Sequence, residues 1–250
     1  MSKFESDYKK LLKRVLTHGT VTKNRTGINT ITSFGEELTI DLAKGFPIVT
    51  GKKIFFDKAL HEYLWIKDGG TKIKYLNDHG IMWWDSYADS DGSLGNTYGY
   101  QLRCFNGEED QLMKAIQEIK NNSRRAYITM WNPSDLHKQV LPCCYTGITF
   151  VRIGYELNLS IDFRSSDIFL GLPYDIIFGA LLLSDVAEFC ELTVGKLKMN
   201  LNNAHLYVNN VIPTKIYLDE PIYKLPTLLK GGREISEYKS GPYIEAILNV

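Results

Sequence analysis

Residues 164–190 read RSSDIFLGLPYDIIFGALLLSDVAEFC. From Pro173 to about Cys190 this stretch is apolar nearly all the way round a helical wheel. Proline suits the first turn of a helix because its fixed φ is already helical and its missing N–H costs nothing there. A helix that has no polar face must be buried on all sides. The stretch therefore predicts a central helix around which the rest of the chain packs.

Helices and strands are both predicted on either side of this stretch. Apolar residues recur at helical spacing in residues 8–16, which Gly19 would end, in residues 53–67 and in residues 110–122. Alternating or β-branched patterns predict strands at residues 28–42, 126–131, 147–153, 157–163 and 199–201, and residues 207–216 favour a further helix. Strands mixed with helices without a regular βαβ repeat indicate an α+β fold, with a mixed sheet packed on the central apolar helix.

The composition fits one domain over residues 1–250. The chain is 44% hydrophobic and 12% aromatic, which is enough for a sizeable core at this length. Lys+Arg and Asp+Glu are equal at 29 each, so no overall charge favours nucleic acid or a membrane surface. The charged amino terminus is unlike a secretion signal, and no apolar run reaches the roughly 18 residues of a membrane span. We expect a cytoplasmic protein.

Four cysteines are present, and their spacing does not match a metal site. We expect free thiols and no metal. Cys143 and Cys144 follow a proline in Leu141-Pro142-Cys143-Cys144-Tyr145. Most buried cysteines act only as small apolar side chains, and a nucleophilic cysteine needs a cationic neighbour that lowers its pKa.

Residues 141–145 and 164–175 together resemble two signatures of thymidylate synthases, enzymes that transfer one carbon to a pyrimidine nucleotide. The resemblance extends in order from about Arg25 to the last residues. It implies the fold of that family, with Cys143 as the nucleophile and Arg164 beside it. Cys144 occupies a position where the family has histidine.

Three further segments resemble the phosphate contacts of the family: residues 24–27 with Arg25, residues 123–125 with Arg124 and Arg125, and residues 164–165 with Arg164 and Ser165. An arginine fork matches two phosphate oxygens at once, although any one of these arginines alone would be read as a surface residue. The resemblance implies that Arg124 and Arg125 reach the phosphate of the opposite subunit, and so implies a homodimer.

Other residues match family positions around the base, the sugar and the folate. The resemblance implies that Glu62 orders waters that carry protons, although an exposed helical glutamate would show the same spacing. It places Tyr98 near the base, and His205 and Tyr207 at the sugar hydroxyl. Asp167 is expected at both substrates. The remaining expected folate contacts are Lys52, Trp83, Trp84, Tyr87, Leu170, Gly171, Tyr174 and Val250, and the tryptophans could equally be core residues.

The chemistry implied by the resemblance begins when the Cys143 thiolate adds to C6 of the pyrimidine. C5 then receives the one-carbon unit of 5,10-methylenetetrahydrofolate, and Tyr98 or a water ordered by Glu62 removes the C5 proton. An exocyclic methylene remains on the ring. Hydride from the folate would give a methyl group and dihydrofolate, whereas water would give a hydroxymethyl group and tetrahydrofolate.

Asp175 departs from the family, which has an asparagine that reads the uracil edge at this position. A carboxylate only accepts hydrogen bonds, so it repels O4 of uracil, accepts from N4–H of cytosine and favours protonation of N3. Such an edge can discriminate by roughly 10⁴. Alternatively, Asp175 could merely favour the dipole of a first helical turn.

Deoxycytidylate hydroxymethylases, the phage branch of the family, carry aspartate here, and this chain resembles that branch. We therefore expect hydroxymethylation of dCMP, in the host cytoplasm if the chain is phage-encoded. A dCMP methylase, an ordinary thymidylate synthase acting on dUMP, and a silent member that binds RNA or a protein partner stay open as alternatives. Retention of Cys143, Glu62, Arg164 and Tyr98 together argues against a silent protein.

Overall fold

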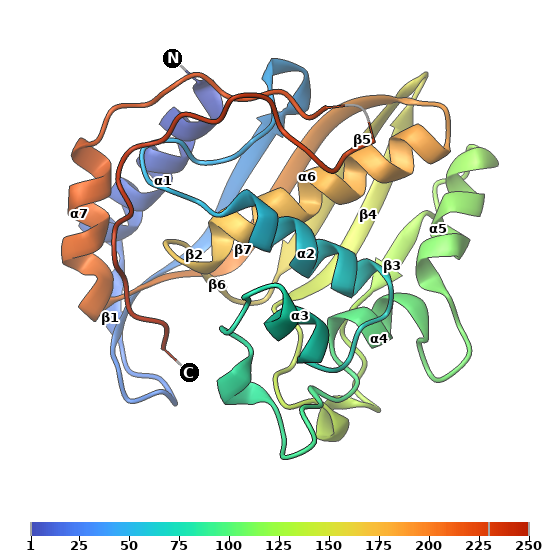
Figure 1. The fold of residues 1–250 in the computed structure, drawn as a ribbon, viewed down its shortest axis with the longest axis horizontal. Coiled ribbons are helices and arrows are strands. Elements are labelled where there is room, and N and C mark those ends of the chain that lie inside the picture. Colours follow the sequence, from blue (N-terminus) through green and yellow to red (C-terminus); the bar gives the residue numbers. More distant parts are fainter. Residues whose placement is uncertain (1, 230, 250) are drawn as a thin grey trace.

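The structure, a computed structural model, describes residues 2–229 and 231–249. Within these ranges the chain forms a seven-stranded sheet in the order β1-β2-β7-β5-β4-β3, with the short β6 paired to β7 (Figure 1). β5 and β6 run parallel to β7, and the other pairs are antiparallel. The strands are β1 (Thr20–Thr22), β2 (Thr30–Asp41), β3 (Tyr127–Thr129), β4 (Tyr145–Ile153), β5 (Glu156–Phe163), β6 (Ser166–Asp167) and β7 (Thr193–Tyr207).

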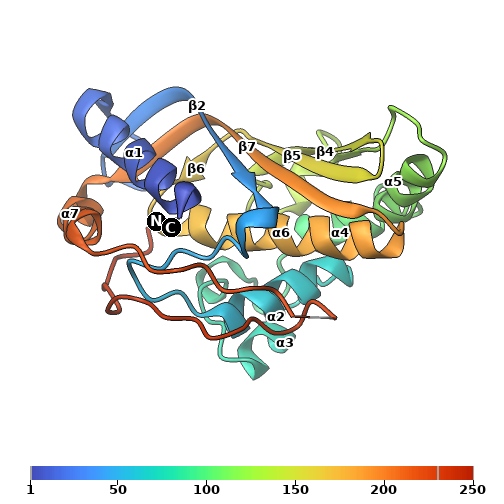
Figure 2. The same ribbon diagram turned by 90° about the horizontal axis from the view of Figure 1, so that it is seen from above.

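The predicted central helix is present as α6 (Gly171–Phe189). It begins two residues before Pro173, and it is buried along most of its length because it lies between the sheet and α2 (Phe56–Lys67) (Figure 2). A Cβ atom at Gly179 would come within 2.9 Å of Leu197 and 3.0 Å of Ile161. The glycine therefore allows α6 to pack closely on β5 and β7.

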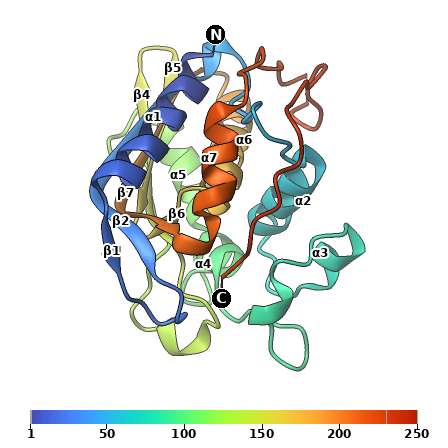
Figure 3. The same cartoon turned by 90° about the vertical axis from the view of Figure 1, so that its left-hand side faces the viewer.

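The remaining helices lie on the same side of the sheet as α6. Figure 3 shows α1, α6 and α7 on one side of the strands and no helix on the other side. These helices are α1 (Lys3–His18), α3 (Lys74–Asp78), α4 (Tyr98–Arg103), α5 (Gln111–Lys120) and α7 (Val211–Asp219), together with 3-10 turns at Leu42–Lys44, Asp85–Tyr87, Leu136–Lys138 and Val208–Asn210. The α+β class with a mixed sheet is therefore confirmed.

The sequence predicts only a small part of the longest strand. The pattern predicts a strand only at residues 199–201, but β7 runs from Thr193 to Tyr207, and the helix expected at residues 207–216 begins only at Val211. Leu197 and Met199 of β7 are buried against α6, whereas Lys198 faces the open side and pairs with Glu37 at 2.9 Å. The polar open face makes the strand inconspicuous in the sequence.

None of the helices in the described part of the chain combines the length and the apolar character that crossing a membrane would require.

Candidate active site

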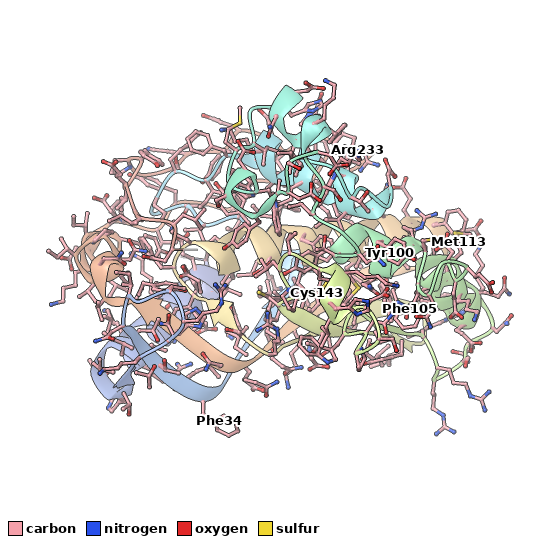
Figure 4. The ribbon with its side chains drawn as sticks, turned by 90° about the horizontal axis from the view of Figure 1, so that it is seen from below. Phe34, Tyr100, Phe105, Met113, Cys143 and Arg233 are labelled. Atoms are coloured by element: carbon pink, nitrogen blue, oxygen red, sulfur yellow. The ribbon has the colours of Figure 1, made fainter. Side chains whose placement is uncertain are left out.

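Cys143 lies in the interior of the molecule, just before β4 begins (Figure 4). Its side chain is fully buried. Arg164, which follows β5, is attached to this segment by its guanidinium: Nε donates to the carbonyl of Cys143 at 2.9 Å and Nη2 donates to the carbonyl of Pro142 at 2.7 Å. The backbone N–H of Arg164 also donates to the carbonyl of Cys144. The sheet therefore fixes a cation beside the predicted nucleophile.

The thiol of Cys143 is held in its neutral form in the absence of substrate. Its pKa is raised to about 12, chiefly by burial and also by the neighbouring Cys144, while Arg164 acts in the opposite direction. A thiolate is the reactive form of cysteine. Arg164 is therefore the group that favours the reactive form at this position.

Tyr98, the first residue of α4, is brought to the same place from a distant part of the chain. Its hydroxyl accepts a hydrogen bond from the backbone N–H of Cys144 at 2.8 Å. Burial raises the pKa of Tyr98 well above its ordinary value, so the phenol keeps its proton in the free protein. The ring of Trp84 packs against it, with the centroids 5.8 Å apart.

Glu62, on α2, is a partly buried residue whose carboxylate has two indole donors. Trp83 and Trp84 both donate from Nε1 to Oε1 of Glu62, at 2.9 and 2.6 Å. Burial raises the pKa of Glu62, and the two indoles partly oppose this. Glu62 is thus positioned by two residues that were predicted as folate contacts, and its other oxygen, Oε2, accepts no hydrogen bond from a described residue.

Asp175 lies one turn into α6 and points back toward the start of that helix. Its Oδ2 is 3.9 Å from the position that a Cβ atom on Gly171 would occupy. Burial raises the pKa of Asp175 well above its ordinary value, and the nearby carboxylates of Glu62 and Asp167 raise it further. No described residue donates a hydrogen bond to its carboxyl. Asp175 is therefore an acid that tends to keep its proton.

Glu62 and Asp175 share a small cavity. Its volume is about 50 Å³, and the residues that line it include Glu62, Asp175, Tyr98 and Tyr145. A water molecule needs roughly 10–15 Å³ of such space and two or more polar partners. The cavity can therefore hold a few water molecules between the two acids.

Arg25 and Tyr207 border the site from the β1–β2 loop and the end of β7. Arg25 is exposed, and its charge lowers the pKa of both Tyr207 and Tyr87, although burial raises the pKa of each tyrosine overall. The charge of Arg25 also acts to lower the pKa of the Cys144 thiol, which burial raises. These effects place a cation at the mouth of the site. Ser165 is partly buried next to Arg164.

Arg124 and Arg125 do not join this group. Both are exposed in the turn between α5 and β3, and neither side chain has a hydrogen bond or an ion pair with a described residue. Of the arginines predicted to contact phosphate, only Arg25 and Arg164 therefore lie near Cys143 and Cys144 within one chain.

His205 and Asp167 lie opposite each other where β6 pairs with β7. Burial lowers the pKa of His205, the charge of Asp167 acts in the opposite direction, and Arg164 lowers it further. The ring of Tyr207 stands nearly perpendicular to that of His205, at 5.5 Å. Oδ1 of Asp167 accepts from the backbone N–H groups of Phe169 and Leu170 at 2.9 and 3.2 Å, which shapes the turn into α6.

The expected folate residues divide into two groups. Trp83 and Tyr174 have ring centroids 5.2 Å apart, and Tyr87 lies 5.9 Å from the ring of Trp84. These rings form an aromatic wall beside Glu62 and fit a flat heterocyclic ligand.

Lys52, in contrast, is buried against the rings of Phe169 and Tyr217. Its Nζ donates to the carbonyl of Phe169 at 2.6 Å, and burial lowers its pKa to about 7. Leu170 and Gly171 form the start of α6. Val250 lies outside the described residues.

Tyr145 was not predicted as a site residue. It begins β4 immediately after Cys144 and is one of the residues that line the cavity. Its place directly after the cysteine pair was the only signal available, because alternation along a strand does not show which face borders a cavity.

Within the described ranges, no three His, Cys, Asp or Glu side chains are grouped as a metal ion would require. The family model described as thymidylate synthase matches residues 6–241, which is nearly the whole chain. Members of this family transfer one carbon from a folate to C5 of a pyrimidine nucleotide. With its buried cysteine beside an arginine and its aromatic wall beside a glutamate, the chain belongs to the thymidylate synthase family.

Proposed function

We propose that this chain converts dCMP to 5-hydroxymethyl-dCMP with 5,10-methylenetetrahydrofolate as the one-carbon donor. The observation that carries the proposal is the carboxyl of Asp175, at a position where the family reads uracil with an amide. Its side chain faces the cavity that also contains Glu62, and it has no described protein partner that would explain it as a purely structural acid.

The raised pKa of Asp175 is compatible with recognition of cytosine, and the preference over uracil rests on the option of moving the proton to the base. A carboxyl that keeps its proton offers one donor and one acceptor, which match the unprotonated N3 and the N4 amino group of cytosine. The same proton can instead reside on N3, which gives a charge-assisted pair with the carboxylate. Uracil can pair only with the neutral carboxyl. Its N3 already carries a hydrogen, and its O4 needs a donor that a carboxylate does not have.

Cys144 supports the same preference. The family has a histidine at this position, on the O4 side of uracil. A thiol is a weak hydrogen-bond donor and carries no positive charge. The chain thus lacks support for a carbonyl oxygen at the place where cytosine has an amino group.

The other residues have the following roles in the proposed reaction. Cys143 adds to C6 of the ring, and Arg164 stabilises its thiolate. Glu62 accepts and returns protons through cavity water. Bound 5,10-methylenetetrahydrofolate supplies the one-carbon unit at C5, and Trp83 and Tyr174 would hold its ring system.

We also propose a homodimer, in which Arg124 and Arg125 complete the phosphate site of the opposite subunit. The sheet face opposite α6 is bare of helices (Figure 3). Phe34 projects from that face with 89% of its side chain exposed (Figure 4). Burial of this face against a second copy would cover Phe34.

The decisive experiment incubates pure protein and 5,10-methylenetetrahydrofolate with either dCMP or dUMP. We expect dCMP to gain the mass of a hydroxymethyl group without formation of dihydrofolate. A methyl product together with dihydrofolate would instead identify a dCMP methylase. Turnover of dUMP alone would identify an ordinary thymidylate synthase and would refute the role of Asp175.

A further inference from the structure

The hydroxyl of Tyr145 is buried without a partner. Only 3% of the Tyr145 surface is exposed, and its Oη forms no hydrogen bond with any described residue. The ring is fixed by Tyr98 at 4.6 Å and by a stacked Phe178 at 5.1 Å, so the hydroxyl cannot turn freely to solvent. Burial of an unpaired hydroxyl is unfavourable, and phenylalanine would pack equally well here. The oxygen atom therefore calls for an explanation.

The cavity can explain the unpaired hydroxyl of Tyr145, because its lining offers both hydrogen-bond donors and acceptors to a water molecule. Glu62 and Asp175 offer carboxyl oxygens that accept hydrogen bonds, whereas Tyr145 offers an O–H that can donate. A water molecule among them can donate one hydrogen to each acid and accept from Tyr145. Its second lone pair then stays free.

We propose that Tyr145 is a positioning residue whose hydroxyl fixes a cavity water shared with Glu62 and Asp175, and that this water captures the exocyclic methylene of the pyrimidine. The inference rests on the proposed function and assigns the source of the hydroxyl oxygen. Burial raises the pKa of Tyr145 well above its ordinary value, and Asp175 and Glu62 are among the groups that raise it further, which agrees with a phenol that stays protonated and donates.

The step balances without an oxidant or a reductant. The water oxygen forms a bond to the methylene carbon, the π electrons of that double bond move into the ring, and a water proton passes to Glu62. The C5=C6 double bond then forms again as the bond from C6 to the sulfur of Cys143 breaks. Cys143 leaves as the thiolate beside Arg164.

The test compares the full-length wild type with Tyr145→Phe, using dCMP that carries tritium at C5. Tritium release reports the steps up to loss of the C5 proton, and product mass reports capture by water. In Tyr145→Phe we expect tritium release within about 3-fold of the wild type and a fall of roughly 10-fold to 100-fold in 5-hydroxymethyl-dCMP, because a displaced nucleophile reacts slowly. An added thiol should trap the waiting methylene in the variant.

Tyr155→Phe is the matched control, because Tyr155 is 79% exposed in the turn between β4 and β5. It should behave as the wild type does. The same ratio of product to tritium release in Tyr145→Phe and in the wild type would overturn the inference, as would a parallel fall of both quantities, which indicates a structural role. If the wild type forms no 5-hydroxymethyl-dCMP, the proposed function itself fails. If only the variant result disagrees, the proposed function survives.

Discussion

Two regions of this molecule remove carboxylates wholly or partly from solvent, and they satisfy these carboxylates to different degrees. Glu5, on α1, is completely buried, and four donors satisfy it. Its Oε1 accepts from the backbone of Gly51 at 2.7 Å and from the hydroxyl of Tyr217 at 2.9 Å, and its Oε2 accepts from the backbone and the hydroxyl of Thr50. Glu62 and Asp175 lie beside a cavity with acceptor oxygens that no described residue uses.

The difference separates a structural acid from two acids for which we predict a role in the reaction. A fully satisfied carboxylate joins three distant segments and has no capacity left for a ligand. An incompletely satisfied buried acid is unfavourable for stability and is kept where a substrate or a water completes it. The number of donors, rather than burial alone, distinguishes the two regions.

The largest effect should come from Asp175→Asn. An amide restores the pattern with which the family reads uracil, so we expect the ratio of kcat/KM for dCMP to that for dUMP to fall by roughly 10⁴. Steady-state kinetics with both nucleotides measure it. Asp219→Asn, at an exposed position at the end of α7, is the control. An unchanged ratio would show that Asp175 does not read the base.

The next largest effect should come from Glu62→Gln. The amide oxygen can still accept from both indoles, because these use only Oε1, but the side chain no longer accepts a proton. We expect turnover to fall by roughly 10²-fold to 10³-fold while the unfolding midpoint in urea does not decrease. The exposed Glu108→Gln serves as the control. Loss of stability and activity together would place Glu62 in the same class as Glu5.

Glu5→Gln should have the opposite effect to Glu62→Gln: we expect it to lower stability and to leave turnover nearly unchanged. Both oxygens of Glu5 accept hydrogen bonds, so a glutamine would turn an NH₂ group toward donors at one of them. We expect a loss of about 3 kcal/mol in the free energy of unfolding, measured in urea. The turnover of the folded fraction should change little. A variant as stable as the wild type would contradict the distinction drawn from the donors.

The sequence predicted the elements whose apolar pattern is unambiguous and missed those that depend on distant contacts. The central helix was clear because residues 173–190 have no polar face, whereas most of β7 was hidden by the lysines on its open face. The α+β class followed from the order of elements. The boundaries of α2 and α7 were shifted because a buried loop residue and a helical residue look alike in the sequence.

The candidate site was predictable in its members but not in its contacts. Motif resemblance named Cys143, Arg164 and Glu62, and their roles stay predictions. Nothing in the sequence indicated that the hydroxyl of Tyr98 accepts from Cys144, 46 residues away, or that two tryptophans donate to one oxygen of Glu62. Such contacts arise when segments meet in space. Tyr145 was missed for the same reason.

The smallest effect concerns pH and tests the unsatisfied state of Asp175 directly. Its pKa is raised in the folded protein, so folding favours the protonated acid, and stability is lost as the pH rises through the folded pKa. The amide that Asp175→Asn introduces cannot ionise. We therefore expect this variant to have a higher Tm than the wild type at about pH 8, by no more than about 4 °C.

The gain in Tm should shrink as the pH falls toward about 4, the pKa of an aspartate in an unfolded chain. At that pH Asp175 is protonated in both the folded and the unfolded wild type. Thermal unfolding at several pH values between about 5 and 8 measures it, with Asp219→Asn as the exposed counterpart. A gain that stays constant over this range would mean that the substitution improves packing and does not remove an ionisation. A gain that grows as the pH falls would mean that Asp175 is stabilised as the carboxylate, and would end the contrast between the two regions.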